Sequence, residues 1–265
     1  IGCCAGFGVP VARYFGAGDH RTMRNYIFNG AVLTAIIAAI LMIACSLSCG
    51  QILHLLSVPD DIFGNAYVYL IVIFIGIPFT LLYNYLSSIL RSVGDSRTPF
   101  LFLGFSAVLN IFLDLFCIIV LKWGCMGVAI ATITAQAISG ILCFFYIRGK
   151  MQLLRLEKEN MIVQKDAVKK LLGMGLPMGF QFSITAIGSM VMQAANNGLG
   201  SIYVSAFTAA MRIKQFLLCP FDAIGTAASV FCSQNLGARQ ADRIKKGALE
   251  ATIAGCIYGF SAGLI

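Results

Sequence analysis

The stretch from Phe100 to Leu121 is the feature that most constrains what this chain can fold into. It is almost wholly apolar and long enough to cross a bilayer as one helix, which needs about 20 residues. Asp114 is its one ionisable side chain, and Asn110 lies one helical turn earlier, so both share a face. A carboxylate at that depth costs about 3 kcal/mol unless it faces a partner, a cavity or an ion. We therefore interpret this face as the functional centre.

The composition predicts an all-α polytopic protein of the cell membrane. The chain is 59% hydrophobic and 11% charged, whereas a soluble domain carries about 25% charged residues. The net charge of +8 comes from Lys and Arg clusters in short segments between apolar spans. That pattern indicates membrane topology and not nucleic-acid binding. The ten cysteines lie mostly within apolar stretches, without a Cys-x-x-Cys motif, so we interpret them as small apolar residues of helices.

About six complete and two partial spans are expected. The complete spans are 27–49, 66–90, 100–121, 125–147, 171–195 and 202–232, and the partial ones are 1–15 and the segment from about 247. We expect a short interfacial helix and turn at 50–65 and a kink at Pro78. The seventh span is long for one crossing, so we expect it to tilt, to bend at Pro220 or to extend beyond the membrane. Both ends of the sequence fall inside apolar segments, which predicts an internal part of a longer protein.

The distribution of basic residues orients these spans. The loops after the first, third, fifth and seventh spans hold almost all of the Lys and Arg residues, whereas the alternate loops hold Lys122 alongside Asp60 and Asp61. By the positive-inside rule the first set is cytoplasmic. Only Arg212 and Lys214, inside the seventh span, do not fit either set.

A short sequence repeat points to two related halves. Phe15-Gly16-Ala17 recurs as Leu236-Gly237-Ala238, and each copy ends an apolar span and opens a cytoplasmic loop. Six spans separate the copies, and because this number is even, both copies have the same orientation. Two parallel halves related by an axis along the membrane normal are typical of transporters.

Three motifs resemble the multidrug and toxic compound extrusion (MATE) family. They are Arg91-x-x-Gly94-Asp95-x-x-x-Pro99, Leu109-Asn110-Ile111-x-x-Asp114 with the continuation Gly124-x-x-Gly127-x-Ala129-x-Ala131-Thr132, and Gln234-Asn235-x-Gly237-Ala238. The resemblance implies a fold of two lobes and twelve helices, with this chain running from the end of the second helix to the start of the ninth. It divides the chain into an amino-terminal lobe (1–148, first helix missing), a cytoplasmic linker (149–170) and a truncated carboxy-terminal lobe (171–265).

The resemblance also implies a monomeric antiporter. It would export organic cations and amphipathic drugs by using a gradient of H⁺ or Na⁺, with no further cofactor and with membrane lipids as its surroundings. Asn110, Asp114 and Thr132 match the family's coupling-cation site. Their chemistry agrees, because carboxylate, amide and hydroxyl oxygens suit Na⁺ and a desolvated carboxylate suits H⁺.

Two further groups of residues are candidates. Asp222, Thr185, Gln193 and Arg212 are expected to line the central cavity. Arg91, Gly94, Asp95 and Pro99 are expected to form a turn with a structural or gating role. Some family members carry an acid in the sixth span counted here, where this chain has Ser183 and Thr185, so no carboxylate-based cation site is predicted in the second lobe.

Several alternatives stay open at the level of sequence. Asp114 also fits a buried structural role, and Asn110 and Thr132 also fit hydrogen bonds between helices. A flippase for a lipid-linked saccharide or peptidoglycan precursor would need basic residues for a diphosphate, and Arg212 and Lys214 are the candidates within a span. A membrane-embedded enzyme is disfavoured because the spans offer no His-rich or paired-acid motif.

Overall fold

The computed structural model describes residues 2–55, 58, 60–197 and 201–263, and these form antiparallel helices without a strand in the described part. The helices are α1 (Gly2–Gly16), α2 (His20–Leu47), α3 (Cys49–Leu55), α4 (Asp60–Ile75), α5 (Ile77–Ser92), α6 (Arg97–Leu115), the π-helix η1 (Phe116–Val120), α7 (Gly124–Lys150), the 3₁₀ turns η2 (Gln152–Leu154) and η3 (Lys158–Asn160), α8 (Lys165–Asn197), α9 (Ser201–Gly237) and α10 (Ala241–Gly263).

The expected number of complete spans is confirmed. Within the described residues, five helices are long and apolar enough to cross a membrane, and α4 with α5 makes a sixth, bent by 44°. The helices α1 and α10 do not meet that criterion. The interfacial segment appears as α3, while residues 56–57 and Pro59 lie outside the described residues. The seventh span is one continuous helix, α9, which passes through Pro220.

The predicted kink at Pro78 is a break between two helices. Pro78 lies in the first turn of α5, where its missing N–H is not needed. The break falls at Gly76, whose carbonyl accepts hydrogen bonds from the N–H groups of Phe79 at 3.0 Å and Thr80 at 3.2 Å. A side chain at Gly76 would collide with Ile133 of α7. The bend therefore follows from proline chemistry, and its position also depends on a close approach by α7.

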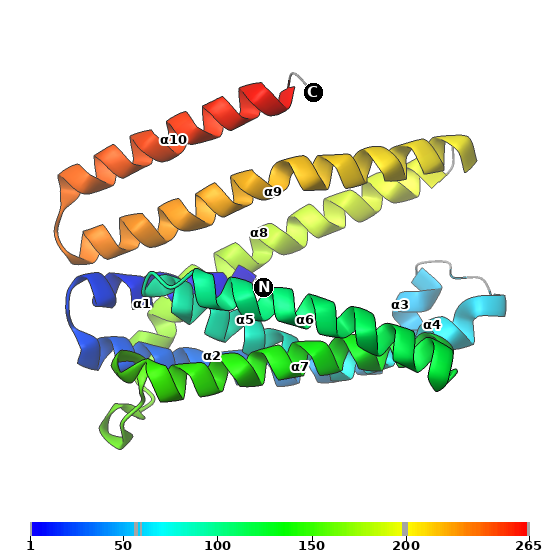
Figure 1. The fold of residues 1–265 in the computed structure, drawn as a ribbon, viewed down its shortest axis with the longest axis horizontal. Helices are drawn as coiled ribbons and strands as arrows, with labels where there is room; N and C mark the ends of the chain where they lie inside the picture. Colours follow the sequence, from blue (N-terminus) through cyan, green and yellow to red (C-terminus); the bar gives the residue numbers. More distant parts are fainter. Residues whose placement is uncertain (1, 56–57, 59, 198–200, 264–265) are drawn as a thin grey trace.

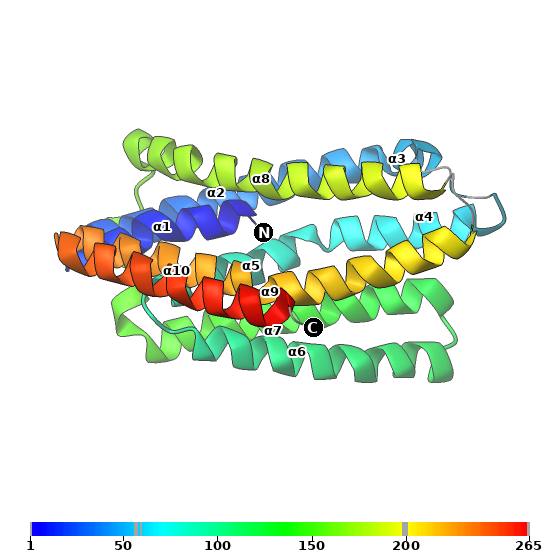
Figure 2. The same ribbon diagram turned by 90° about the horizontal axis from the view of Figure 1, so that it is seen from above.

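The helices form two groups that share α1 (Figures 1 and 2). One group contains α2, α4, α5, α6 and α7, and the other contains α8, α9 and α10. α1 packs against both α5 and α8: its Phe7 is buried in the main apolar core, and a Cβ on Gly6 would lie 2.6 Å from the Cα of Gly175 in α8. The loops that follow α1, α5, α7 and α9 all lie at one end of the molecule, as the predicted orientation requires.

The two copies of the sequence repeat meet at this end. A Cβ on Gly16 would collide with the backbone of Gln234, and a Cβ on Gly237 would collide with the carbonyl of Arg13. The Gln234 side chain donates a hydrogen bond of 2.8 Å to the carbonyl of Ser92, at the end of α5. The backbones of α1 and α9 are thus in direct contact, because glycine stands at both equivalent positions.

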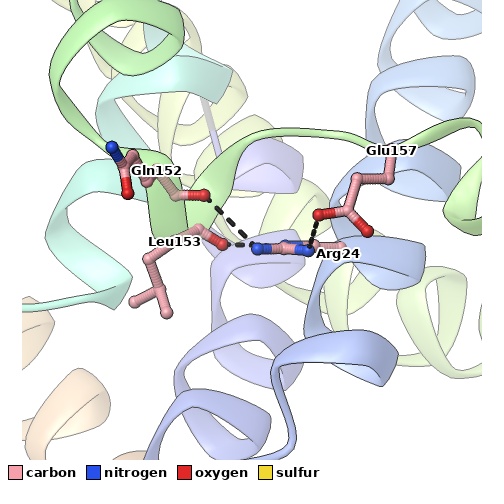
Figure 3. A network of polar contacts seen from close by, with 4 residues as sticks. All are labelled: Arg24, Gln152, Leu153 and Glu157. Carbon is pink, nitrogen blue, oxygen red and sulfur yellow. Dashed lines mark hydrogen bonds and ion pairs between the residues drawn. The ribbon is translucent and has the colours of Figure 1, made fainter.

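The connection between α7 and α8 is bound tightly to α2. Arg24 donates hydrogen bonds to the carbonyls of Leu153 at 3.0 Å and Gln152 at 3.3 Å and forms an ion pair of 2.5 Å with Glu157 (Figure 3). One turn further along, the buried Asn29 uses both ends of its amide: Nδ2 donates to the Ile162 carbonyl at 3.0 Å and Oδ1 accepts from the Gln164 N–H at 3.1 Å. The polar connection predicted at 149–170 is therefore an ordered segment of the fold.

We expect Asn29→Leu to release this connection. The exposed fraction of Asn29 is 1%. Its loss leaves the Gln164 N–H without its partner, at a cost of about 1–3 kcal/mol, and removes one of the two hydrogen bonds to the Ile162 carbonyl, of which the one from Asn25 remains. Limited trypsin digestion of the purified protein should then cut within residues 151–164 at least tenfold faster. Glu157→Gln is the control: the carboxylate of this ion pair is largely exposed, and such pairs contribute less than about 1 kcal/mol. Equal digestion rates in the two variants would contradict this assignment.

Candidate coupling-cation site

A line of polar contacts joins α6 to α7. Along it, side chains of one helix bond to the other: Ser139 Oγ to the Phe102 carbonyl at 3.2 Å, Ser106 Oγ to the Ala135 carbonyl at 2.9 Å, and Asn110 Nδ2 to Thr132 Oγ1 at 3.5 Å. Thr132 Oγ1 also donates to the Val128 carbonyl of its own helix at 3.0 Å. Two of the three residues predicted for the cation site are therefore in contact.

Asp114 follows Asn110 by one turn on the same face of α6. Its Oδ1 is enclosed and has no hydrogen-bond partner among the described residues. No hydrogen bond joins it to Asn110 or Thr132 within that part of the chain. An enclosed carboxylate oxygen without a partner is costly in free energy, and a proton or a cation would satisfy it. The three residues thus lie along one side of α6 and α7, with the acid one turn beyond the contacting pair.

The helix changes its hydrogen-bond pattern directly after Asp114. α6 ends at Leu115 and continues as the π-helix η1, in which the Leu121 N–H reaches the Phe116 carbonyl at 3.2 Å. α7 approaches closely here, since a Cβ on Gly127 would lie 2.8 Å from the Cβ of Cys117. Wide helical turns of this kind are frequent at functional sites. The sequence predicted one regular span, because residues 105–121 contain neither proline nor glycine.

Sequence reasoning also missed a polar pair near the site. Thr80 of α5 donates a hydrogen bond to Oε1 of Gln136. Gln136 lies one turn from Thr132 on α7, and Thr80 lies in the first turn after the Gly76 break. The sequence did offer one signal for this pair, since Gln136 is a polar residue inside an apolar span. The pair links the bent span to the helix that carries Thr132.

The motif that contains Arg91, Gly94, Asp95 and Pro99 builds the turn between α5 and α6. Gly94 adopts φ +91°, a conformation that other residues reach only with strain. Asp95 Oδ1 accepts a 3.0 Å hydrogen bond from the N–H of Thr98 in the first turn of α6, and the Tyr83 hydroxyl donates to the Pro99 carbonyl at 3.0 Å. These contacts give the motif a structural part, and its role in gating stays a prediction.

The candidates of the second lobe lie apart from this site, on α8 and α9. The Thr185 hydroxyl donates to the Gln181 carbonyl of its own helix at 2.9 Å. Asp222 and Arg212 have exposed side chains on α9, and Gln193 is half-buried on α8. None of the four lines the cavity between α1 and α9 or the cavity between α2, α5 and α7. Their role in a central cavity stays a prediction.

Fold and site together define a class of protein. A bundle of spans with two contacting copies of a repeat, and with an acid inside one span that has an enclosed carboxylate oxygen, is the architecture of a membrane transporter. The sequence profile of the MatE family matches residues 1–116 and 177–265. The chain therefore belongs to the MatE family, whose members are multi-pass transport proteins of the cell membrane and not enzymes.

Similar proteins agree with this assignment. The chain is 34% identical over 193 residues to the probable multidrug resistance protein YpnP of Bacillus subtilis, covering 73% of this chain and 43% of that protein. It is 25% identical over 253 residues to a protein named FAD transporter of Shewanella oneidensis, covering 94% of this chain and 56% of that protein. The chain thus spans about half the length of the curated relatives it matches.

Solved structures share the fold. A MOP superfamily transporter from Pyrococcus furiosus matches with a TM-score of 0.88 and 22% identity, covering 98% of this chain and 59% of the other. A structure described as the outward-facing conformation of a MATE family transporter matches with a TM-score of 0.87, and one described as inward-facing with 0.75, each over 98% of this chain and at 22% identity.

Two glycine-to-alanine substitutions should change stability in opposite directions. Gly94 and Gly104 both have open space where a Cβ would stand. At Gly94 the positive φ makes alanine strained by about 1 kcal/mol or more. At Gly104, inside α6, alanine should stabilise the helix by up to about 1 kcal/mol. Thermal denaturation of the purified variants should therefore show a lower midpoint for Gly94→Ala and an equal or higher one for Gly104→Ala. An unchanged or higher midpoint for Gly94→Ala would contradict the turn described here.

Proposed function

We propose that the protein containing this chain exports organic cations or amphipathic drugs in exchange for H⁺ or Na⁺, with Asp114 as the coupling carboxylate. The observation that carries the proposal is the enclosed, unpartnered Oδ1 of Asp114 beside the Asn110–Thr132 pair, within a span. The multidrug resistance names of relatives support the cargo class.

The coupling follows from linkage between cation and conformation. A proton or Na⁺ that enters from outside neutralises the Asp114 carboxylate and gives its enclosed oxygen a partner. The conformation that encloses the loaded site then becomes favoured. Cargo leaves on the outer side, and loss of the cation to the cytoplasm resets the cycle. Exchange requires that the cation and the cargo favour different conformations.

We expect Asp114→Asn to abolish gradient-driven transport. The test uses the full-length protein in inverted membrane vesicles and follows uptake of a fluorescent organic cation under an imposed H⁺ gradient and, separately, an imposed Na⁺ gradient. The active gradient names the coupling ion. Asp166→Asn is the matched control, because Asp166 is an exposed acid at the start of α8 and its substitution should leave transport unchanged.

The outcomes separate the alternatives. Transport that survives Asp114→Asn at equal expression would make Asp114 a structural residue. No cation transport under either gradient would favour the flippase, whose substrate would be a lipid-linked diphosphate. Because one relative is named FAD transporter, the dinucleotide belongs among the cargoes tried.

The glycine contact between α1 and α9 gives a second prediction about transport. Gly16→Leu or Gly237→Leu should hold the cytoplasmic ends of the two helices apart, because the side chain would occupy space filled by backbone. Spin labels in the loops after α1 and α9, in a background without native cysteines, should show a longer mean distance, and export should fall at least tenfold. Gly225→Leu on the same α9, where nothing lies within 4 Å, is the control; an unchanged distance in the Gly16 and Gly237 variants would contradict the prediction.

A further inference from the structure

A cavity lies between α2, α5 and the cytoplasmic part of α7, and none of Asp114, Asn110 and Thr132 lines it. Its volume is about 820 Å³, within the range of ligand pockets, which is about 300–1,000 Å³. α2 and α5 contribute most of its lining, α7 contributes residues near its cytoplasmic end, and part of the connection after α7 completes it. We refer to this cavity as the lateral crevice.

The crevice is apolar and elongated. Its lining follows α2 from Ile27 to Met42, a distance of about 22 Å at 1.5 Å per residue. This exceeds the hydrocarbon depth of one leaflet, since the whole core is about 30 Å thick. Alanines at 31, 35, 38 and 39 leave the wall of α2 hollow, while Phe79 and Phe144 border the opposite side. The shape fits an extended acyl chain.

One polar side chain of α2 lies among the apolar lining. Thr34 lines the wall and is 6% exposed. Its Oγ1 is enclosed by the protein and lies beside the thiol of Cys4. The hydroxyl is therefore turned into the protein, and the surface that α2 presents to the crevice is apolar.

Two cations stand at the cytoplasmic mouth. Arg148, in the last turn of α7, and Arg155, after η2, both line the crevice and have exposed side chains. Within the described part of the chain neither forms an ion pair. Of the two acids of this connection, Glu157 and Glu159, the first is paired with Arg24. Basic pockets between helices at the cytoplasmic surface bind anionic lipid headgroups.

We propose that the lateral crevice binds an anionic phospholipid of the cytoplasmic leaflet. One acyl chain lies along the alanines of α2, and the phosphate lies between Arg148 and Arg155. The lipid would contact α2, α7 and the connection at once, and so it would hold the connection in place from the membrane side. This inference does not depend on the direction or the cargo of transport.

The first test compares lipid binding by native mass spectrometry. Purified full-length protein is delipidated and titrated with phosphatidylglycerol or with phosphatidylcholine of the same acyl chains. Wild type should retain phosphatidylglycerol more strongly than phosphatidylcholine. Arg148→Gln or Arg155→Gln alone should weaken phosphatidylglycerol binding by about fivefold, and the two together by about 30-fold. Arg239→Gln with Arg243→Gln, in the turn after α9 and the first turn of α10, removes the same charge and should have no effect.

A second variant tests the apolar part. Ala39→Phe fills the crevice and should weaken binding of both lipids at least tenfold, whereas Ala107→Phe, on the exposed face of α6, should change neither. Unchanged binding in Ala39→Phe or in the double arginine variant overturns the proposal, as does equal retention of both lipids by wild type.

Two further outcomes identify a different occupant. Inorganic phosphate, added up to 10 mM, is the competitor in a separate experiment. If phosphate displaces phosphatidylglycerol when the two are present at about equal concentration, the arginines hold a free anion and the lipid site is refuted. If Ala39→Cys stays unreactive toward a membrane-soluble maleimide in the delipidated protein, another segment of the protein fills the crevice, and the proposal fails. If the introduced cysteine reacts in the delipidated protein and added phosphatidylglycerol suppresses that reaction, the result supports the proposal.

Discussion

The structure depends on one constraint: inside a bilayer, each polar group must find its hydrogen-bond partner within the protein. The contact between α6 and α7 obeys this rule through Ser139, Ser106, Asn110 and Thr132, which bond across the two helices or to backbone carbonyls. Asp114 is the exception on the same face. The polar side chains around Asp114 on this contact have partners, whereas one of its carboxylate oxygens is enclosed without one. This difference is the observation that supports the proposed cation site.

α1 has a second organising role. It is short, and it contacts α2, α5, α8 and α9, so that the main apolar core combines Phe7 and Val11 of α1 with Leu171 of α8. Glycines make this possible: Gly6 and Gly175 bring α1 onto α8, and Gly16 and Gly237 bring it onto α9. A helix predicted for one lobe therefore carries much of the contact between the two groups of helices. The repeat detected in the sequence marks the place where the groups touch.

Much of this architecture could be predicted from sequence because hydropathy, basic loops and proline act locally. The spans, their orientation and the break near Pro78 follow from such signals, and the one-turn spacing of Asn110 and Asp114 placed both on one face. Features set by neighbouring helices could not be predicted in this way. The π-helix after Asp114 has no local sequence signal, the Thr80–Gln136 pair requires the packing of α5 on α7, and the exact position of the break at Gly76 requires Ile133. The ordered connection was also missed, because its partners are asparagines of α2 more than 130 residues earlier.

The docking of that connection has a mechanical consequence. Gln164 is held by Asn29, and α8 begins at the next residue, Lys165. Although the linker is long in sequence, almost no free chain remains between the last anchor on α2 and the first turn of α8. The covalent link therefore acts as a hinge and not as a flexible linker. α8 can rotate about its first turn, but it cannot move away from α2 unless the asparagine contacts break. Any large separation of the two groups of helices at this end must include local unfolding of the connection, which sets an energetic threshold for such a movement.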